Sequence, residues 1–486
     1  MENKKNMSRI SIRKNYIYSM SYQILSLITP VITAPYIARI FGADGTGIQS
    51  YTNSINSYFL LFAMLGVTTY GQREVARHRD NQEICSKIFW EIVLMTFATT
   101  GVCMIGWTAL ICLSKEYTIY YAVLTINLLA EPLNISWFFG GQEQFKYVVL
   151  RNTFFRLGGI AILFLFVRKK DDLLLYMGLL ASTGFLGNIS MWTYLPKFLV
   201  KVNPRELNIK RHLRKTMIYF IPTIATSVYT VLDKTMIGML TRSEAENGYY
   251  EQATKIMNIA KSMIYSLNTV MSARMSYLFS VEKTEEIKAK LNRSFGFLML
   301  IEVPMALGII GVAENFVPWF FGDGYEKTIQ LLQILSPILV IISISNCLGN
   351  QYLIPSGQQS RGTKGILAGA GVNFLLNLLF IPWLASIGAA IASVTAESVI
   401  SMIYVYMSKG YADWKMIWEN VWKRLIAGCV MFFAVFCIGK GYSGSVWITM
   451  VQVFAGGCIY FIVLYLEKDN LVRELMGEVR DKVRKK

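Results

Sequence analysis

The residues with the greatest potential for chemistry lie on two consecutive apolar segments near the middle of the chain. On the segment that begins near residue 217, one helical face carries hydroxyl groups and a lysine: Thr223, Ser227, Thr230 and Lys234. The adjoining face carries Thr226, Tyr229 and Asp233. The segment that begins near residue 249 adds Glu251, Lys255, Asn258, Lys261 and Ser262. Charges in apolar surroundings need partners, so these residues predict either structural ion pairs, such as Asp233 with Lys255, or a cavity whose lysines bind an anionic substrate.

The composition identifies the solvent around these segments as a membrane. The chain has 486 residues, of which 54% are hydrophobic and 16% charged, with a mean hydropathy of +0.41. Soluble domains contain about 25% charged residues. Because a helix needs roughly 20 apolar residues to cross a bilayer, the chain has room for about a dozen spans. We therefore predict an all-α polytopic membrane protein.

The distribution of basic residues predicts the orientation. Apolar windows give about fourteen spans, beginning near residues 16, 47, 88, 118, 148, 173, 217, 249, 294, 327, 364, 386, 424 and 445. With the N-terminus inside, the inner segments, which include 141–151, hold 36 of the 48 Lys and Arg residues, and the outer links hold about 8. Both termini are predicted to be cytoplasmic. The net charge of +17 is spread over eight inner segments, which argues against a nucleic-acid partner.

Loop lengths and an internal repeat predict the domain organisation. Gln49, Asn53 and Asn56 have the same spacing as Glu251, Lys255 and Asn258, displaced by 202 residues. The predicted parts are an N-terminal six-helix lobe (1–195), a basic cytoplasmic linker (196–216), a C-terminal six-helix lobe (217–407), two additional helices (408–466) and a basic cytoplasmic tail (467–486). The linker is interpreted as an interfacial helix in contact with anionic membrane lipids.

Other embedded polar residues have two interpretations each. Arg156 either points into a cavity or extends to the inner interface. The acids Glu131, Glu302 and Glu397 are candidates for ion coupling or packing residues.

The two histidines, His78 and His212, fall in predicted polar loops, which argues against a histidine-based site in the membrane. The seven cysteines contain no C-x-x-C pair and are interpreted as apolar packing residues. No catalytic, metal-binding or cofactor-binding residues are predicted.

Three stretches carry a resemblance to a known family. They read PYIARIFGADGTGIQSY, GVTTYGQREVARHRD and LDKTMIGMLTRSEAENGYYEQATKI. They closely resemble the polysaccharide transporters, the Wzx-like O-antigen and capsule repeat-unit flippases of the multidrug/oligosaccharidyl-lipid/polysaccharide exporter superfamily. The resemblance implies two six-helix lobes around a central cavity, two further helices, alternating access, and an undecaprenyl-diphosphate-linked oligosaccharide as substrate in the bacterial cytoplasmic membrane. It also implies polysaccharide polymerase machinery as a partner. The functional candidates that it transfers to this chain are Arg39, Asp233, Lys234 and Lys255.

Three alternatives remain open at this stage. An ion-coupled multidrug exporter would have the same fold, but cationic drugs favour an acidic cavity, and here Arg39, Lys234, Lys255 and Lys261 outnumber Asp233 and Glu251. A lipid II flippase is the nearest sibling. A membrane glycosyltransferase or polymerase would need large external loops for its glycosidic chemistry, whereas the predicted external links are about ten residues or fewer.

Overall fold

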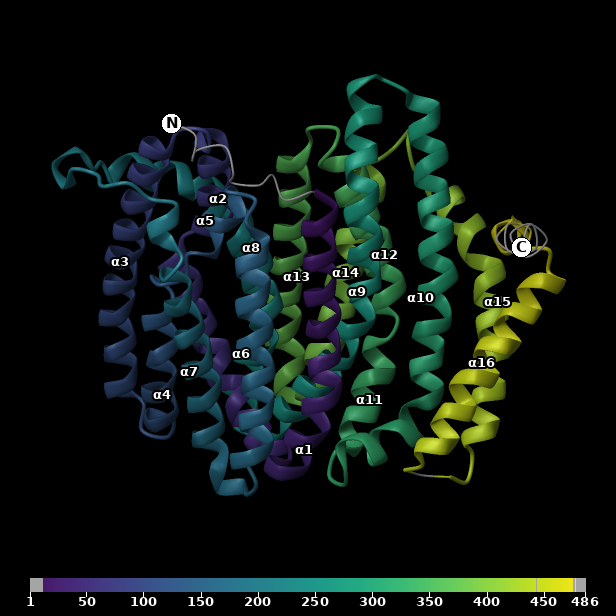
Figure 1. Cartoon of the computed structure of the whole chain (residues 1–486). Coiled ribbons are helices and arrows are strands. Elements are labelled where there is room, and N and C mark those ends of the chain that lie inside the picture. Colours follow the sequence, from purple (N-terminus) through teal and green to yellow (C-terminus); the bar gives the residue numbers. More distant parts are fainter. Residues whose placement is uncertain (1–11, 443, 475–476, 478–486) are drawn as a thin grey trace. The chain divides into compact units, whose positions relative to one another are not determined.

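The computed structural model describes residues 12–442, 444–474 and 477, and the regular structure in these ranges is entirely helical (Figure 1). The predicted all-α fold is therefore confirmed for the described part of the chain. The N-terminal tail before residue 12 and most of the predicted C-terminal tail lie outside the described residues. So do the side chains of Thr226, Ser227, Tyr229 and Thr230.

The chain divides into two compact units, 12–41 with 48–231 and 42–47 with 232 onward. The helices of the first unit are α1 (Ile12–Met64), α2 (Val67–His78), α3 (Gln82–Leu113), α4 (Thr118–Ala130), α5 (Ser136–Gly141), α6 (Phe145–Phe166), α7 (Leu173–Trp192) and the first part of α8 (Lys210–Thr241). The second unit contains the end of α8 and the helices α9 (Glu244–Ser280), α10 (Thr284–Phe321), α11 (Glu326–Leu335), α12 (Ile338–Leu348), α13 (Gln359–Leu384), α14 (Ser386–Met407), α15 (Trp414–Gly439) and α16 (Val446–Leu466).

Many of these helices are suited to a bilayer. Among the described residues, nine helices are long and apolar enough to cross a membrane, or ten if the bent pair α11 and α12 forms one span. That count treats α1 and α2 as one segment of 59 residues. At 1.5 Å per residue such a segment would be about 90 Å long, roughly three bilayer cores. Gly42 divides α1, because its φ of 66° and ψ of −173° are not helical. The fold is that of a multi-span membrane protein, and the number of fourteen spans stays a prediction.

Each unit contains one broken helix at a proline. In the first unit, Glu131 and Pro132 separate α4 from α5. In the second, Pro337 separates α11 from α12, with a bend of 40°. Proline cannot donate the backbone hydrogen bond that would continue a helix. The two breaks give the units a shared feature, which agrees with an internal repeat, while the predicted lobe boundaries remain a proposal.

The linker between α7 and α8 corrects one sequence prediction. An interfacial helix was predicted over 196–216, but the structure shows only the short 3₁₀ turns Leu195–Lys197 and Pro204–Glu206 before α8 begins at Lys210. Asn203 accepts a hydrogen bond from the backbone of Arg205, which favours a local turn over a continuous helix. The linker is therefore not one continuous helix: residues 198–209 are mostly irregular, and only 210–216 are helical, as the start of α8.

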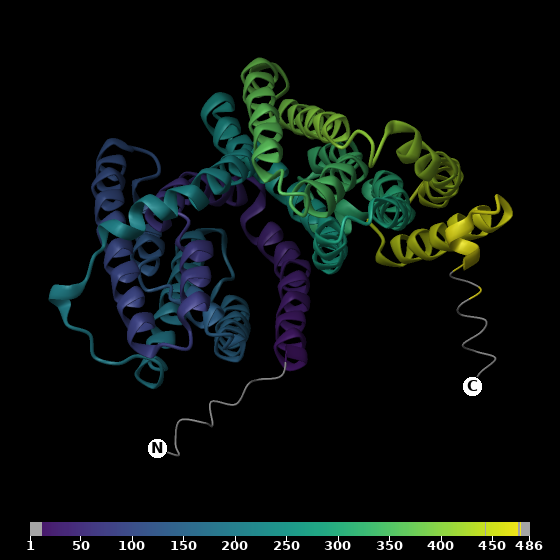
Figure 2. The ribbon, with the colours of Figure 1, turned by 90° about the horizontal axis from the view of Figure 1, so that it is seen from above.

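In the second unit, α13 packs along α14 and α10 packs along α15. The connection from α13 to α14 is the single residue Ala385. Such closeness depends on small residues, because a Cβ at Gly388 would lie 2.6 Å from the backbone of Phe380. Seen end-on in Figure 2, α15 and α16, drawn in yellow-green and yellow, lie at the periphery of this unit. Because α15 and α16 pack against α10, α13 and α14 are left to contact α9 and the end of α8.

Candidate functional site: an arginine cavity and a buried carboxylate cluster

A cavity of about 520 Å³ lies within the first unit. Its polar lining comes from α1, α4, α6, α7 and the break after α4: Tyr22, Thr29, Thr33, Asn127, Glu131, Arg151, Asn152, Arg156, Thr183 and Asn188. We call it the arginine cavity. Arg151 and Arg156 both belong to α6, where a spacing of five residues separates them by about 140° around the helix axis, yet both line the cavity.

The two guanidinium groups are held by neutral partners. Arg156 donates from one Nη to the hydroxyl of Tyr22 at 3.1 Å and to that of Ser26 at 2.7 Å, and its guanidinium lies 5.7 Å from the Tyr22 ring centroid. Arg151 donates to Oδ1 of Asn188 at 2.8 Å. Neither arginine forms an ion pair with any carboxylate that the structure describes. Their positive charges are therefore oriented but not neutralised.

One donor in the cavity lacks an acceptor. Nε of Arg151 is buried and has no hydrogen-bond partner among the described residues. An unsatisfied buried donor costs about 1–3 kcal/mol, more if charged. A phosphate oxygen is an acceptor that matches the planar guanidinium fork. The arginine cavity can therefore bind an anion, with amide and hydroxyl groups around it suited to sugar hydroxyls.

Arg156 lines the arginine cavity within the first unit, and its place in a substrate pathway stays a prediction. Arg151 was missed, because the charge count assigned it to an inner segment. Glu131, a candidate for ion coupling, lines this cavity and also a second one of about 380 Å³ in the same unit. Its role in coupling stays a prediction.

The remaining candidates of the first unit have different surroundings. Asn56 is buried, donates to the carbonyl of Leu124 and accepts from Asn127, and so connects α1 to α4. Asn53 is half-buried and accepts, through its backbone carbonyl, the hydroxyl of Ser57. Arg39 is exposed near the end of the first part of α1. None of these three lines the arginine cavity, so their place in a substrate pathway remains a prediction.

In the second unit, Asp233 lies at the centre of what we call the Asp233 cluster. Its carboxylate accepts hydrogen bonds from Tyr250 on α9 at 2.5 Å, from Asn373 and Asn377 on α13 at 3.1 and 2.7 Å, and from the hydroxyl of Ser393 on α14. All five side chains are buried. Four helices thus meet at one carboxylate.

The neighbouring lysines correct the predicted pairing of Asp233 with Lys255. Nζ of Lys234 lies 2.6 Å from one carboxylate oxygen of Glu251, and Nζ of Lys255 lies 3.5 Å from the other. Consecutive helical residues point about 100° apart, so Asp233 and Lys234 face different neighbours. Glu251 therefore neutralises the two lysines in part, and the group has one net positive charge.

The other sequence candidates of this unit are scattered. Asn258 is exposed, and Lys261 is half-buried with Glu397 and then Asp233 as its electrostatic neighbours. Glu302 is fully buried on α10, and neither of its carboxylate oxygens has a partner among the described residues. Nothing in these contacts shows ion coupling, which stays a prediction for Glu131, Glu302 and Glu397.

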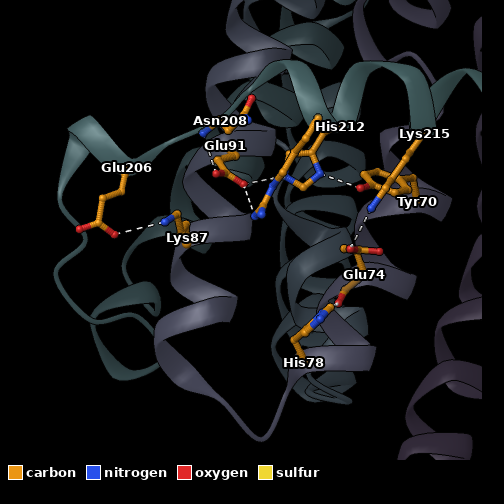
Figure 3. Close-up of polar contacts among 10 residues, drawn as sticks. Tyr70, Glu74, His78, Lys87, Glu91, Glu206, Asn208, His212 and Lys215 are labelled. Atoms are coloured by element: carbon orange, nitrogen blue, oxygen red, sulfur yellow. Dashed lines mark hydrogen bonds and ion pairs between the residues drawn. The ribbon is translucent and has the colours of Figure 1, made fainter.

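A third polar group corrects the prediction for His212. Instead of lying in a polar loop, His212 is buried in the first turn of α8, where Nδ1 lies 2.6 Å from the hydroxyl of Tyr70 and Nε2 lies 2.7 Å from Glu91 (Figure 3). Glu91 on α3 also meets Arg211 at 2.5 Å and accepts the backbone N–H of Asn208 at 2.7 Å. His78 ends α2, with Nδ1 2.9 Å from the carbonyl of Glu74.

This group, which we call the Glu91 latch, attaches the linker and the start of α8 to α2 and α3. Figure 3 shows Glu91 and Tyr70 on opposite sides of the His212 ring. Burial lowers the pKa of His212 from its ordinary value, against the hydrogen bond to Glu91, which raises it. His212 precedes the predicted span and holds the chain in place, so the latch is a structural joint.

The helical architecture and the membrane-suited helices define the class as a multi-span membrane protein. The chain belongs to the family described as "Polysaccharide biosynthesis protein", whose model matches residues 12–278. The resemblance found in the three sequence stretches is thereby confirmed.

Two relatives match most of the chain. It is 23% identical over 403 residues to the "Putative O-antigen transporter" of Escherichia coli (strain K12), covering 82% of this chain and 97% of the relative. It is 21% identical over 472 residues to the "Probable low-salt glycan biosynthesis flippase Agl15" of Haloferax volcanii, covering 91% and 95%.

Solved structures share the fold. One is "Lipid II flippase MurJ, inward closed conformation", with a TM-score of 0.69 and 15% identity over 95% of this chain and all of the other. Another is an inward-facing multidrug resistance MATE transporter of the MOP superfamily, with a TM-score of 0.59 and 13% identity, covering 84% of this chain and 98% of the other. At these identities the likeness shows a shared fold.

Proposed function

We propose that this chain is a flippase that moves undecaprenyl-diphosphate-linked oligosaccharide repeat units from the inner to the outer leaflet of a bacterial cytoplasmic membrane, by alternating access, for surface polysaccharide synthesis. The observation that carries the proposal is the arginine cavity, with two unneutralised guanidinium groups among amides and hydroxyls. The names of the two relatives, a transporter and a flippase, support it.

The chemistry of the substrate matches this cavity. A diphosphate and its sugars cannot enter hydrocarbon without large desolvation costs. Arg151 and Arg156 would bind the diphosphate oxygens by charge-assisted hydrogen bonds, with the unpartnered Nε of Arg151 as one donor. Asn127, Asn152 and Asn188 offer both donors and acceptors to sugar hydroxyls.

Transport of this kind makes and breaks no covalent bond in the substrate, so it needs no catalytic residues. The prediction that the chain is not an enzyme agrees with the names of its relatives. Contacts with anionic lipids and with a polysaccharide polymerase remain predictions, as does the cytoplasmic location of both termini.

The test is complementation of a bacterial host that lacks its own repeat-unit flippase, using several hosts with different repeat units. We expect the wild-type chain to restore surface polymer and to remove accumulated lipid-linked precursor in at least one host. Arg151→Ala and Arg156→Ala should each reduce surface polymer by at least about tenfold, because hydrogen bonds to charged groups contribute about 1.5–3 kcal/mol. Arg168→Ala is the matched control, since Arg168 is exposed just after α6 and outside the cavity.

A multidrug exporter is the alternative that the shared fold leaves. Cationic drugs would be repelled by two unneutralised arginines, although Glu131 lies in the same cavity. Drug resistance conferred by the wild-type chain, with no effect on polymer in any host and with the protein present in the membrane, would contradict the flippase proposal.

A further inference from the structure

A cavity of about 400 Å³ lies within the second unit, where α9 ends and α13 begins. We call it the serine–aromatic pocket. Its lining comes from the last turns of α9, from the segment between α12 and α13, and from the connection between α14 and α15: Ser276, Phe279, Ser280, Tyr352, Pro355, Ser356, Gln358 and Tyr411. This volume falls in the range of small-molecule sites, about 300–1,000 Å³. The described lining contains no Lys, Arg, Asp or Glu, so a ligand would be recognised without an ion pair.

The backbone between α12 and α13 departs from the α-helix where it supplies half of this lining. Gly349–Leu353 forms a single π-helical turn, in which the N–H of Ile354 donates to a carbonyl five residues earlier at 3.0 Å. Gly357 then adopts a φ of 75°, which glycine does without strain, and α13 follows. Single π-helical turns are rare and occur frequently at functional sites. Tyr352, which lies in this turn, faces the pocket as a result.

Three aromatic rings from three segments form one side of the pocket. The ring centroids of Tyr352 and Tyr411 lie 5.0 Å apart, and each lies 5.8 Å from that of Phe279. Tyr352 is 5% exposed, which fixes its ring, and the other two side chains are half-buried. The face of an aromatic ring is electron-rich and attracts the weakly positive C–H groups of a ligand. The flat C–H face of a sugar ring is a surface of this kind.

The polar groups of the pocket supply both acceptors and a donor. Each of its three serines donates its hydroxyl proton to a backbone carbonyl three or four residues earlier, at 2.8 to 3.3 Å, so the serine oxygens remain as acceptors. The hydroxyl oxygen of Tyr352 accepts from Nε2 of Gln358 at 3.2 Å, which leaves the phenol proton as a donor. Sugar hydroxyls both donate and accept, so they match this mixture.

The same groups select a neutral ligand over a charged one. An anion would need donors, whereas the serine hydroxyl protons are already used within the protein. A cation could bind to aromatic faces, but Nη1 of Arg361 lies 2.7 Å from Oε1 of Gln358, and its positive charge beside the lining opposes a second one. A neutral ring with a C–H face and hydroxyl groups at its edge satisfies both the aromatic rings and the serines.

We propose that the serine–aromatic pocket binds a neutral sugar ring, which stacks on the aromatic side and donates hydrogen bonds to the serine oxygens. The pocket belongs to the second unit and shares no residue with the arginine cavity of the first. The proposal goes beyond the flippase function, because the binding of a sugar is measured without a diphosphate or a lipid.

The experiment is saturation-transfer difference NMR on the purified full-length chain in detergent, with empty micelles as the blank. The probes are the methyl glycosides of D-glucose, D-galactose and N-acetyl-D-glucosamine, with choline chloride as a cationic probe. We expect saturation of the ring C–H protons of at least one sugar. Tyr411→Ala should reduce this signal by at least about threefold, because one aromatic face is lost. Tyr442→Ala is the matched control, since Tyr442 is an exposed tyrosine of the same unit outside the pocket, and its signal should equal that of the wild type.

A second variant keeps the test valid if Tyr411→Ala does not fold. Ser276 is exposed and lines the pocket, so Ser276→Trp fills the space without removing a buried side chain and should abolish the signal. Elution as a single species on size-exclusion chromatography confirms that each variant is folded. Absence of saturation for all three sugars in the wild type would overturn the proposal, and so would saturation of choline alone. A sugar signal that survives in both folded variants would overturn it as well, since the sugar would then bind elsewhere, and the flippase proposal would stand.

The filled variant also separates two sources of the sugar. If the ligand is part of the transported oligosaccharide, Ser276→Trp should lower surface polymer in the complementation assay. If the ligand is a free sugar, surface polymer should equal that of the wild type. Either result, together with a sugar signal that the variant abolishes, supports the pocket and assigns its ligand.

Discussion

Two buried carboxylates, Glu91 in the first unit and Asp233 in the second, are neutralised in different ways. Glu91 is met by Arg211 and His212, and by a backbone N–H, at distances of 2.5 to 2.7 Å. Asp233 is met only by neutral donors within hydrogen-bonding distance. A permanent counter-charge fixes one arrangement of the helices around it. A carboxylate without one depends on its hydrogen bonds, so the difference separates a joint fixed by opposite charges from one fixed by neutral donors.

The same chemical change at the two carboxylates should have different consequences, and the largest expected effect is at the latch. Glu91→Gln removes the charge that balances Arg211 and leaves one acceptor oxygen for the two groups, the Asn208 N–H and the His212 ring, that the carboxylate binds. We expect a loss of roughly 2–3 kcal/mol in stability, because breaking a buried ion pair leaves a charge without its partner. The measurement is the melting temperature in detergent, which should fall by several degrees. An unchanged melting temperature would show that the latch does not contribute to the stability of the folded chain.

Acid should weaken the latch through His212. Burial lowers the pKa of this histidine, and the groups that face it are Glu91, Arg211, Glu74 and Tyr70. The unfolded chain then binds the proton more readily than the folded chain. Stability should therefore be constant above about pH 6.5 and decrease as the pH falls from there towards the lowered pKa of the folded state.

The check is the melting temperature at pH 7.5 and 5.5 in the wild type and in His212→Gln. Other groups titrate in both proteins, so the difference between the two isolates the histidine. The wild type should lose more stability on acidification than the variant. Equal losses would mean that His212 does not respond to pH in the folded chain.

The corresponding change at Asp233 should affect stability much less. Asp233→Asn removes a buried charge and keeps the size of the side chain. We therefore expect a free energy of unfolding within about 1 kcal/mol of the wild type, and a correspondingly small change in melting temperature. A variant as destabilised as Glu91→Gln would remove the distinction between the two carboxylates.

The smallest expected effect on stability is that of the lysines beside Asp233. Lys255 and Lys234 are partly exposed, with 24% of each side chain accessible, and they share Glu251. Exposed ion pairs contribute about 0–1 kcal/mol, so Lys255→Ala should change the melting temperature little. The sequence predicts that Lys234→Ala and Lys255→Ala abolish flipping while the protein is still expressed. Full complementation by both variants would show that their role is limited to neutralising Glu251.

The sequence predicted the elements well where hydropathy alone decides them. Each predicted span falls on a described helix, and the short link between the eleventh and twelfth is the single residue Ala385. The predicted positions of individual residues were wrong where a charged or polar residue was assumed to lie in a loop. Arg151 was counted as an inner-loop residue and His212 as a loop residue, although tertiary partners draw both into the protein. A basic stretch with scattered apolar residues also predicted a linker helix over 196–216, of which only 210–216 are helical, as the start of α8.

Long-range contacts explain what the sequence could not give at the Asp233 cluster. The motif LDKTMIG drew attention to Asp233, but of its four partners only Tyr250 is close in sequence, and the other three lie 140 to 160 residues later in the chain. The only local signal for them is the pair Asn373 and Asn377, four residues apart in the apolar helix α13, which indicates one polar face. Which carboxylate that face meets depends on how α13 packs against α8, and hydropathy does not encode this.

The most direct test of the flippase proposal is translocation in vesicles made from the purified chain and a fluorescently labelled undecaprenyl-diphosphate oligosaccharide. A membrane-impermeant sugar-cleaving enzyme added outside reports which molecules have reached the outer leaflet. The proposal predicts that the protected inner pool becomes accessible with the wild-type chain and remains protected in protein-free vesicles. With Arg151→Ala or Arg156→Ala, accessibility should appear at least about tenfold more slowly than with Arg168→Ala. An inner pool that stays protected with the wild-type chain would contradict the proposal.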